Sequence, residues 1–568
     1  MADTAVLAPG DESREKEPSV EGNGTASLTP PESIDNKGGY ENFKPGPRVW
    51  LAFMTLCVLT LMVALDGTSI SVALPIIARA LNGTALEAFW SGTSFLLCST
   101  VFQPSFASFS NIFGRKPMIL TALVFFLAGS ILAAVSENFT HLLIGRSIQG
   151  VGGGGLIALT EIVVTDLVPL RLRGQYFGII SSMWSLGSVL GPVLGGGFAE
   201  DVSWRWIFYI NLPFIGIGGV FVIVFLKLNF IPTSLREKLQ KIDYIGTVIF
   251  VGSATSFLIP VTWGGVMYEW DSWRTLVPLL IGVAGLTVFM FYEGYVAQDP
   301  IIPPSIFSTR TAIVNYAGTI LHGLVLWCGL YYMPLYFLAV KEFTPIMSGV
   351  ALFPQTFTVA PSAALTGFLI TATGHYRLPI WVGWAMSTFG CGLVCYIKED
   401  TSTVAWIFLL LVEGFGLGIL FPSLGFAIQA SAKPKNLAIA VAMFSFFRAF
   451  GQAIGVAVGG VVFQNQMRHN VASYPALAPY ADSYSADAAG LVEIIRLMPD
   501  GDDKHNLKVA YTDSLRIVWA VCCGVLALGG ILSAFTESYD LNQAIDTDQG
   551  LREEKKASPQ EEEGQLSS

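Results

Sequence analysis

The sequence predicts an all-α integral membrane protein with fourteen transmembrane helices, arranged as two pseudo-symmetric six-helix bundles plus an inserted helix pair. Of its 568 residues, 52% are hydrophobic and only 13% are charged, whereas a soluble domain carries roughly 25% charged residues. Long uncharged runs recur along the chain, and about 20 apolar residues suffice to cross a bilayer as a helix. These runs group as six, two and six, and internal symmetry of this kind is typical of transporters.

Fourteen apolar segments are long enough to span a membrane. The first six are joined by tight loops, and the charged stretch TSLREKLQKID separates them from a pair that Pro260 and Pro278 interrupt. A Pro-rich connector, AQDPIIPPSIF, precedes the last six. In chain order the predicted spans cover residues 50–75, 87–108, 117–135, 141–166, 175–199, 206–228, 244–262, 275–296, 313–339, 347–371, 378–397, 403–430, 438–463 and 514–535.

The spans divide the chain into five parts. Its two ends are polar and rich in Glu, Ser, Pro and Gly, a composition that predicts disorder. A long outer loop at 464–513 interrupts the second bundle, and a short helix is expected within it at Ala488–Met498. The five parts are a disordered cytoplasmic tail (1–48), an N-terminal six-helix bundle (49–228), a linker with two extra membrane helices (229–312), a C-terminal six-helix bundle (313–535) and a disordered acidic cytoplasmic tail (536–568).

The net charge of −10 resides in the two tails. Residues 1–48 hold nine acids and five bases, which gives −4, and residues 536–568 hold nine acids and three bases, which gives −6. The membrane portion is therefore neutral overall. A nucleic-acid partner requires a basic patch, and the sequence contains none, so nucleic acid is not expected to bind.

Positive charge differs between the two sets of short loops. With the N-terminus in the cytoplasm, the inner short loops hold twelve Lys and Arg residues and the outer ones hold five. Cytoplasmic loops are enriched in Lys and Arg, so both termini are expected to be cytoplasmic. The sequons at Asn82 and Asn138 then lie outside, where glycosylation can reach them. We expect a plasma membrane location, with a vacuolar or vesicular membrane as the alternative.

The loop between the second and third spans, ASFSNIFGRK (residues 107–116), carries a motif. Gly114 permits a tight turn, and Arg115 and Lys116 hold the loop on the inner side. The segment resembles Gly-x-Leu-x-Asp-x-x-Gly-Arg-Lys, the signature of the major facilitator superfamily. In that family the Asp joins a charge network that gates the cytoplasmic side.

This chain departs from the signature at three positions, since Ala107 replaces the first Gly, Phe109 the Leu and Asn111 the Asp. The gating network has thereby lost one charge. Asp166 stands at the inner end of the fourth span, and we expect Arg115 to pair with it instead.

Three further segments in the first half resemble the fourteen-helix drug:proton antiporters of that superfamily. LDGTSISVALP (residues 65–75) resembles the Leu-Asp-x-Thr…Ala-Leu-Pro signature, with Ser71 where Asn is usual. RSIQGVGGG (146–154) resembles the fourth-helix motif Arg-x-x-Gln-Gly-x-Gly, and WRWIFYINLP (204–213) resembles the sixth-helix entry. Downstream, WGGVMYEW and FFRAFGQAIGVAVGGVVFQNQ are similar to fungal toxin and secondary-metabolite exporters. The resemblance thus extends over nearly the whole membrane portion.

The fifth span contains the antiporter motif of this branch. Gly and Pro cost about 1 and 3 kcal/mol in a water-exposed helix, but packing partners tolerate them within a membrane. Gly187, Gly191 and Gly195 recur every fourth residue and form a groove against which another helix can pack closely. Pro192 predicts a kink, and the resemblance implies export. The members of the motif are Gly178, Gly187, Gly191, Pro192, Gly195 and Gly196.

Asp66 in the first span and Arg146 in the fourth are buried charges at similar predicted depths. Charges inside a membrane are expensive and mark ion or substrate pathways. We expect the two to pair or to share a water cavity, where the carboxylate can take up and release a proton. The resemblance implicates the fourth-helix Arg in proton coupling. The alternative is a static ion pair that only locks two helices together.

Other ionisable groups lie within predicted spans. Glu161, Glu413 and Arg448 suit either a structural or a transport role, and Glu413 and Arg448 are expected to face each other across the second half. His322 can titrate near neutrality, although a hydrogen-bonded structural histidine is the better interpretation.

The sequence predicts neither a metal nor a cofactor. The seven cysteines all lie in apolar segments and are interpreted as packing residues. The Gly-x-Gly-x-x-Gly pattern at 150–155 lies inside a span, where it permits close helix approach rather than dinucleotide binding. Because no Walker lysine motif is present, the proton gradient and not ATP is the expected energy source.

The expected function is proton-coupled efflux of a hydrophobic small organic molecule, such as a toxin, secondary metabolite or drug, by a monomeric secondary transporter in the lipid bilayer. Aromatic residues make up 12% of the chain and suit an apolar cavity for planar molecules. The alternative within transport is a siderophore or nutrient carrier. A receptor or membrane enzyme would require a large soluble domain or a catalytic constellation, and the sequence shows neither.

Overall fold

The computed structural model describes residues 43, 45–83, 85–229, 233–265, 267–486, 488–543, 547, 549 and 550. Within these ranges the ordered backbone is helical, and it contains no strand beyond isolated bridges such as Gly264 with Tyr268. The all-α prediction is therefore confirmed. Most of the two predicted disordered tails, 1–42 and 551–568 among them, falls outside these residues.

The N-terminal bundle follows the first six predicted spans. Gly114 turns the chain between the second and third helices at a φ of 96°, a conformation that favours glycine. Asn138 caps the fourth helix, since its side chain accepts a hydrogen bond from the His141 amide at 2.9 Å. The helices are α1 (Pro47–Ala80), α2 (Ala85–Phe113), α3 (Arg115–Ala134), α4 (Phe139–Leu167), α5 (Arg173–Gly197), α6 (Trp206–Tyr209) and α7 (Asn211–Phe225).

The linker contains a short helix, α8 (Leu235–Gln240), and the inserted pair, α9 (Tyr244–Trp263) and α10 (Trp273–Tyr295). Side-chain caps start both members of the pair, from Asp243 and Ser272 respectively. Helix α9 contacts α2 of the first bundle and α16 (Leu437–Ala472) of the second. The inserted pair therefore borders both bundles through α9.

The C-terminal bundle differs from its prediction mainly at the outer loop. The last span begins at Asp502 rather than near 514, and much of the loop is helical, including the short helix expected near 488–498. Hydropathy detects only the apolar part of a helix, whereas Asp502 and Asp503 extend this one at its N-terminus, where acids are favourable. The helices are α11 (Arg310–Ala339), α12 (Pro345–Ala351), α13 (Phe353–Thr373), α14 (Arg377–Val394), α15 (Thr403–Ser431), α16 (Leu437–Ala472), α17 (Ala481–Ala486), α18 (Ala488–Leu497) and α19 (Asp502–Ser533).

Each of the fourteen predicted spans corresponds to a helix, or to a broken helix at α6–α7 and at α12–α13. Among the described residues, twelve helical segments are long and apolar enough to cross a membrane. The other two predicted spans are α2 and α14. Helix α2 carries eight Ser and Thr residues, which lower its hydropathy, and α14 is only 18 residues long. Composition thus supports twelve spans directly.

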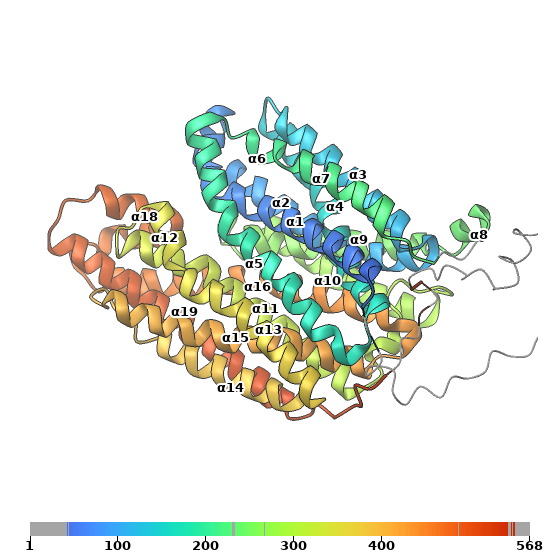
Figure 1. The fold of residues 1–568 in the computed structure, drawn as a ribbon. Coiled ribbons are helices and arrows are strands. Elements are labelled where there is room, and N and C mark those ends of the chain that lie inside the picture. The colour runs from blue at the N-terminus through green and yellow to red at the C-terminus, as the bar shows by residue number, and fades with distance from the viewer. Residues whose placement is uncertain are drawn as a thin grey trace, which may run out of the picture. The chain divides into compact units, whose positions relative to one another are not determined.

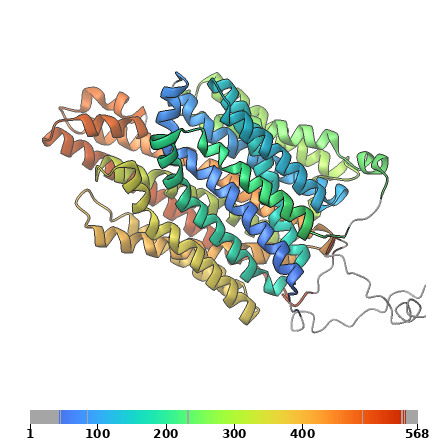
Figure 2. The same ribbon diagram turned by 45° about the horizontal axis from the view of Figure 1, so that its top comes forward.

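The two bundles meet chiefly through α5 with α13 and through α16 with α2 and α4. In Figures 1 and 2 the first bundle runs from blue to green and the second from yellow to red. The described hydrogen bonds and ion pairs between them lie toward the end that holds the α2–α3 and α4–α5 loops, hereafter the inner end. Arg171 donates to the Thr371 carbonyl at 2.9 Å, and Arg173 donates to Gln429 Oε1 at 3.0 Å. Charge bias predicts this end to be cytoplasmic.

Candidate functional site

An ion pair between Asp66 and Arg146 lies inside the N-terminal bundle. Arg146 Nη1 donates to Asp66 Oδ2 at 2.6 Å, and neither side chain is exposed. The contact joins α1 to α4. Of the two arrangements expected from the sequence, a direct pair or a shared cavity, the structure shows the direct pair.

Two side-chain amides complete the surroundings of the carboxylate. Asp66 Oδ1 accepts hydrogen bonds from Gln149 Nε2 and from Asn211 Nδ2, each at 2.7 Å. Gln149 also donates to Ser130 Oγ at 2.9 Å. Asp66, Gln149 and Asn211 come from three different sequence motifs, LDGT, RSIQG and WRWIFYINLP. Those motifs therefore converge on one buried carboxylate, and Gln149 and Asn211 are site residues that sequence reasoning missed.

The Arg146 guanidinium is held on several sides. Its Nε donates to the Ser91 carbonyl at 3.0 Å, and its Nη1 also donates to Gln149 Oε1 at 2.6 Å. The Phe95 ring lies 4.4 Å from the guanidinium carbon and the Phe208 ring 5.7 Å, distances typical of cation–π contacts. Within the described part of the chain, Arg146 Nη2 has no hydrogen-bond partner.

This geometry determines what a proton can do at the site. Ionised Asp66 accepts three charge-assisted hydrogen bonds, from α4 twice and from α7 once. Such bonds are about twice as strong as neutral ones. Neutralisation of Asp66 would remove the carboxylate charge from all three bonds at once. The arrangement therefore links the charge of one carboxylate to the packing of α1 against α4 and α7.

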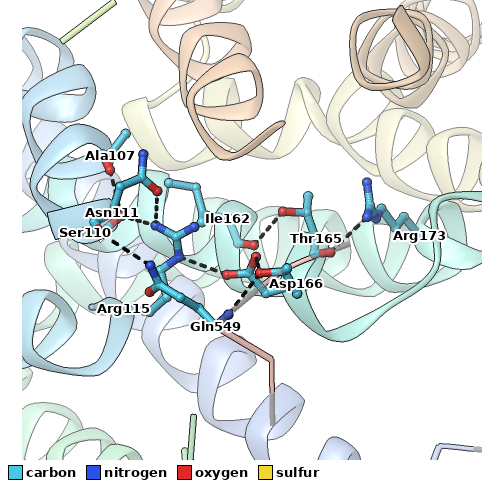
Figure 3. Close-up of polar contacts among 10 residues, drawn as sticks. Ala107, Ser110, Asn111, Arg115, Ile162, Thr165, Asp166, Arg173 and Gln549 are labelled. Atoms are coloured by element: carbon cyan, nitrogen blue, oxygen red, sulfur yellow. Dashed lines mark hydrogen bonds and ion pairs between the residues drawn. The ribbon is translucent and has the colours of Figure 1, made fainter. Parts of the chain in front are cut away.

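The segment 107–116, which the sequence predicts to be a loop, forms the junction of α2 and α3 at Gly114 and holds a second charged site at the inner end. Arg115 Nε donates to Asp166 Oδ2 at 2.9 Å, and Arg115 Nη1 donates to Ser110 Oγ at 2.7 Å and to Asn111 Oδ1 at 2.6 Å. Figure 3 shows Arg115 between Asn111 and Asp166. The expected pairing of Arg115 with Asp166 is thus present, and Asn111 remains in the network as a neutral acceptor.

Two other cations fasten the loops around this site. Lys116 Nζ donates to the Ile223 carbonyl at 2.7 Å, near the C-terminus of α7, where a positive charge is favourable. Arg173 binds the carbonyls of Thr165 and Val168 at 2.8 Å each and also reaches α15. From the sequence alone, Arg173 is one of the twelve inner-loop cations and shows no sign of this second role.

We expect Asp166→Asn to reduce export severalfold. The substitution leaves the Arg115 charge without its counter-ion in a site where the two side chains are only 4% and 7% exposed, and breaking a buried pair from one side costs about 3–5 kcal/mol. Export is measured in cells at matched protein level. The exposed Asp201→Asn is the control. Unchanged export in Asp166→Asn would show that Arg115 does not depend on this carboxylate.

The antiporter motif packs against two different helices. A Cβ at Gly187 would lie 3.0 Å from the Leu65 amide nitrogen of α1, and one at Gly191 or Gly195 would collide with Thr68 or Ser69 of the same helix. The predicted close contact is therefore present, and it is made with α1.

The inner part of the same helix packs across the boundary between bundles. A Cβ at Gly178 would lie 2.8 Å from the Ala364 Cα, and one at Gly174 would lie 2.6 Å from the Gly367 carbonyl oxygen. Both partners belong to α13. Gly196 has a looser neighbour in Val72, and α5 runs through Pro192 without an interruption. The motif therefore contributes to packing inside the first bundle, against α1, and to the contact between the two bundles, against α13.

A third charged group bridges the bundles. Glu161 of α4 accepts a hydrogen bond from the Ser445 hydroxyl of α16 and lies 3.6 Å from Arg448 Nη2. The Arg448 guanidinium carbon lies 4.3 Å from the Phe421 ring centre and 5.3 Å from that of Phe444. The pair combines charge with aromatic surface between the halves.

The expectation that Glu413 and Arg448 face each other is wrong. Arg448 points toward α4 and Glu161, while Glu413 accepts a hydrogen bond from Gln355 Nε2 at 3.2 Å within the second bundle. Sequence spacing places a residue on a helix but not the rotation of that helix, so the partner of Arg448 was not predictable from α15 and α16 alone.

His322 is hydrogen-bonded through Nε2 to the Leu417 carbonyl at 3.0 Å and is buried. This contact agrees with the hydrogen-bonded structural histidine expected from the sequence. The seven cysteines are free and buried or half-buried, as expected for packing residues.

The two sequon asparagines are exposed at the opposite, outer end. Asn82 lies in the α1–α2 turn at a φ of 50°, and its sequon partner Thr84 lies outside the described residues. Asn138 is the cap of α4. Glycosylation of either remains a prediction.

The chain matches the Major Facilitator Superfamily over residues 56–456. It is 57% identical to the MFS transporter L2 of Phoma sp., over 92% of this chain and 88% of that protein. It is 37% identical to the efflux pump FUS6 of Gibberella fujikuroi over 93% of this chain and 96% of the relative. It is also 37% identical to the MFS-type efflux pump LUC4 of Fusarium sp., over 90% and 91%.

Among solved structures, the chain is similar to the human organic anion transporter MFSD10 (TETRAN). The TM-score is 0.54 at 15% sequence identity, and the match covers 86% of this chain and all of that one. At that identity the likeness is one of fold.

Proposed function

Because the chain belongs to the Major Facilitator Superfamily, we propose that it is a proton-coupled exporter of a hydrophobic small organic molecule, from the fourteen-helix drug:proton antiporter branch. It is a multi-pass membrane transporter by family and by its apolar helices. The relatives named efflux pumps support the outward direction, as does the glycine motif of α5.

The observation that carries the proton-coupling proposal is the buried network around Asp66. One carboxylate holds α1, α4 and α7 together through three hydrogen bonds to its two oxygens. In the proposed cycle Asp66 receives a proton from outside as substrate leaves, and it returns the proton to the cytoplasm when the bundle resets. Arg146 stabilises the ionised state.

Alternating access is the proposed route for the substrate. The contacts that join the bundles at the inner end, including Arg173 with Gln429 and Glu161 with Ser445, keep that end closed. In the proposed cycle these contacts break when the bundles rock apart. The face of α5 at Gly174 and Gly178 carries no side chains, so in this cycle the two bundles slide past each other along it.

The substrate is proposed to be a planar or amphipathic toxin, secondary metabolite or drug. Arg448 with Phe421 and Phe444 places aromatic surface beside the inter-bundle charges, which suits such molecules. We propose a monomer in the plasma membrane with both termini in the cytoplasm, in line with the loop charge bias.

Intracellular accumulation of a metabolite panel tests the function. Cells that lack the protein are expected to retain one or more hydrophobic metabolites that cells with the protein export. A proton uncoupler is expected to make the two cell types alike. Export that continues undiminished with the uncoupler contradicts proton coupling, and a growth effect confined to iron limitation identifies a siderophore carrier instead.

A further inference from the structure

The chain does not leave the bundle where α19 ends. Residues 536–543 together with Thr547, Gln549 and Gly550, named here the C-terminal strap, lie against the inner end. The strap begins on the second bundle, where the Glu537 amide donates to Thr311 Oγ1 at 2.9 Å and Tyr376 donates to the Glu537 carbonyl at 2.8 Å. Leu541 is 1% exposed. This part of the predicted disordered tail is therefore held by specific contacts.

The strap then reaches the first bundle at its inner loops. Arg171 Nη1, in the α4–α5 loop, donates to Asn542 Oδ1 at 2.8 Å. The same arginine donates through Nε and Nη2 to the carbonyls of Thr371 and Ala372 at the end of α13. Arg171 therefore holds the strap and the second bundle together.

Further along, the strap contacts the gating network itself. Thr547 Oγ1 donates to Asp166 Oδ1 at 2.9 Å, and Gln549 Nε2 donates to the Asn111 carbonyl at 3.4 Å. The Asn229 amide, after α7, donates to the Gly550 carbonyl at 2.8 Å. Figure 3 shows Gln549 beside Arg115 and Asp166.

The two oxygens of Asp166 are divided between these partners. Arg115 takes Oδ2 and Thr547 takes Oδ1. Hydrogen bonds to a carboxylate stabilise its charged form, and the charged form is the one that binds Arg115. The family signature has an Asp where Asn111 stands. In this chain the network also includes the Thr547 hydroxyl, which lies outside the signature segment and donates to Asp166.

We propose that the strap is a component of the inner gate, with Thr547 and Gln549 as positioning residues that act through Asp166 and the α2–α3 loop. The strap is covalently continuous with the second bundle, and it is hydrogen-bonded to the inner ends of α2 and α4, to the α4–α5 loop and to Asn229 after α7. Separation of the bundles at the inner end requires those bonds to break. The strap thus favours the closed inner gate and sets how often that gate opens. This inference rests on the alternating access of the proposed function.

Cysteine accessibility at the inner gate tests the proposal in the full chain. Ala442 on α16 has no exposure and packs with the core of the first bundle, so Ala442→Cys reports opening. A membrane-impermeant maleimide is applied to inside-out vesicles, and the parent chain gives the background of the native cysteines. We expect Thr547→Val to speed labelling roughly tenfold to a hundredfold, because one hydrogen bond to a charged group is lost.

Thr547→Ser is the matched control, since it keeps the hydroxyl. In the Ala442→Cys background it is expected to label at the same rate as Ala442→Cys alone, which is the parent rate below. Thr547→Asp sets a second carboxylate against Asp166 and is expected to label faster than Thr547→Val. In transport, faster opening is expected to change kcat and leave the KM for the exported metabolite unchanged. If Thr547→Val reduces the folded yield, Gln549→Ala provides the same test from the neighbouring contact.

Labelling rates of Thr547→Val, Thr547→Asp and Gln549→Ala that all equal the parent rate would overturn the proposal. The same holds if Thr547→Ser labels as fast as Thr547→Val, because the hydroxyl is then irrelevant. The labelling assay does not depend on export. If the protein exports nothing but its Thr547→Val variant still labels faster, then the proposed function is wrong. The assignment of the strap to the inner gate would stand in that case.

Discussion

Asp66→Asn and Arg146→Ala are each expected to abolish proton-driven export while the protein still inserts into the membrane. Asp66→Asn removes the only charge that balances Arg146 within the network, and it replaces one of the two acceptor oxygens with an amide NH2, which cannot accept a hydrogen bond from Arg146. Arg146→Ala leaves a buried carboxylate without its cation, which costs about 3–5 kcal/mol. Export and surface level are measured together in cells that express tagged protein.

The controls are Asp201→Asn and Arg79→Ala, which change exposed charges at the outer end and are expected to export normally. If the ion pair only held α1 and α4 together, the amount of folded protein in both site variants would fall as much as the export rate does. Retained protein with lost export indicates coupling. Normal export in both site variants contradicts the assignment.

Gly195→Ala is expected to destabilise the first bundle and to reduce export strongly. The added Cβ collides with the Ser69 carbonyl oxygen on α1, and backbone atoms on both sides leave little room to adjust. Overpacking of this kind costs about 1–3 kcal/mol or more. Thermal unfolding in detergent, followed by loss of the monodisperse peak, measures the change.

Gly197→Ala is the matched control two residues away. A Cβ at Gly197 meets nothing within 4 Å, and alanine is the better helix former, so its stability is expected to equal or exceed that of the parent. Equal melting temperatures for Gly195→Ala and Gly197→Ala would show that the α1–α5 contact is not tight.

The sequence predicted the helices well because hydropathy and turn residues are local signals. It also predicted two contacts that join distant segments, Asp66 with Arg146 and Arg115 with Asp166. Both predictions were possible because charges inside a membrane need partners at similar depth, and few charges were available. Gly187, Gly191 and Gly195 similarly indicated a close helix contact without naming α1.

The errors concern helix rotation and polar loops. Arg448 pairs with Glu161 rather than Glu413 because α16 turns that face toward the first bundle. The sequence did not identify Gln149 and Asn211 as site residues. A neutral amide inside a membrane helix does not require a charged partner, so its position alone does not predict its contacts. The strap was missed because its acidic, polar composition is that of a disordered tail, and its order comes from tertiary contacts such as Thr547 with Asp166.

Proton-driven transport in vesicles tests the central claim most directly. Inside-out vesicles are loaded with acidic buffer, and uptake of the metabolite retained by cells lacking the protein is followed with and without a protonophore. Proton-coupled export predicts concentrative uptake that needs the acidic lumen, stops with the protonophore and is absent in Asp66→Asn. Uptake that ignores the gradient, or that persists at the parent rate in Asp66→Asn, would contradict it.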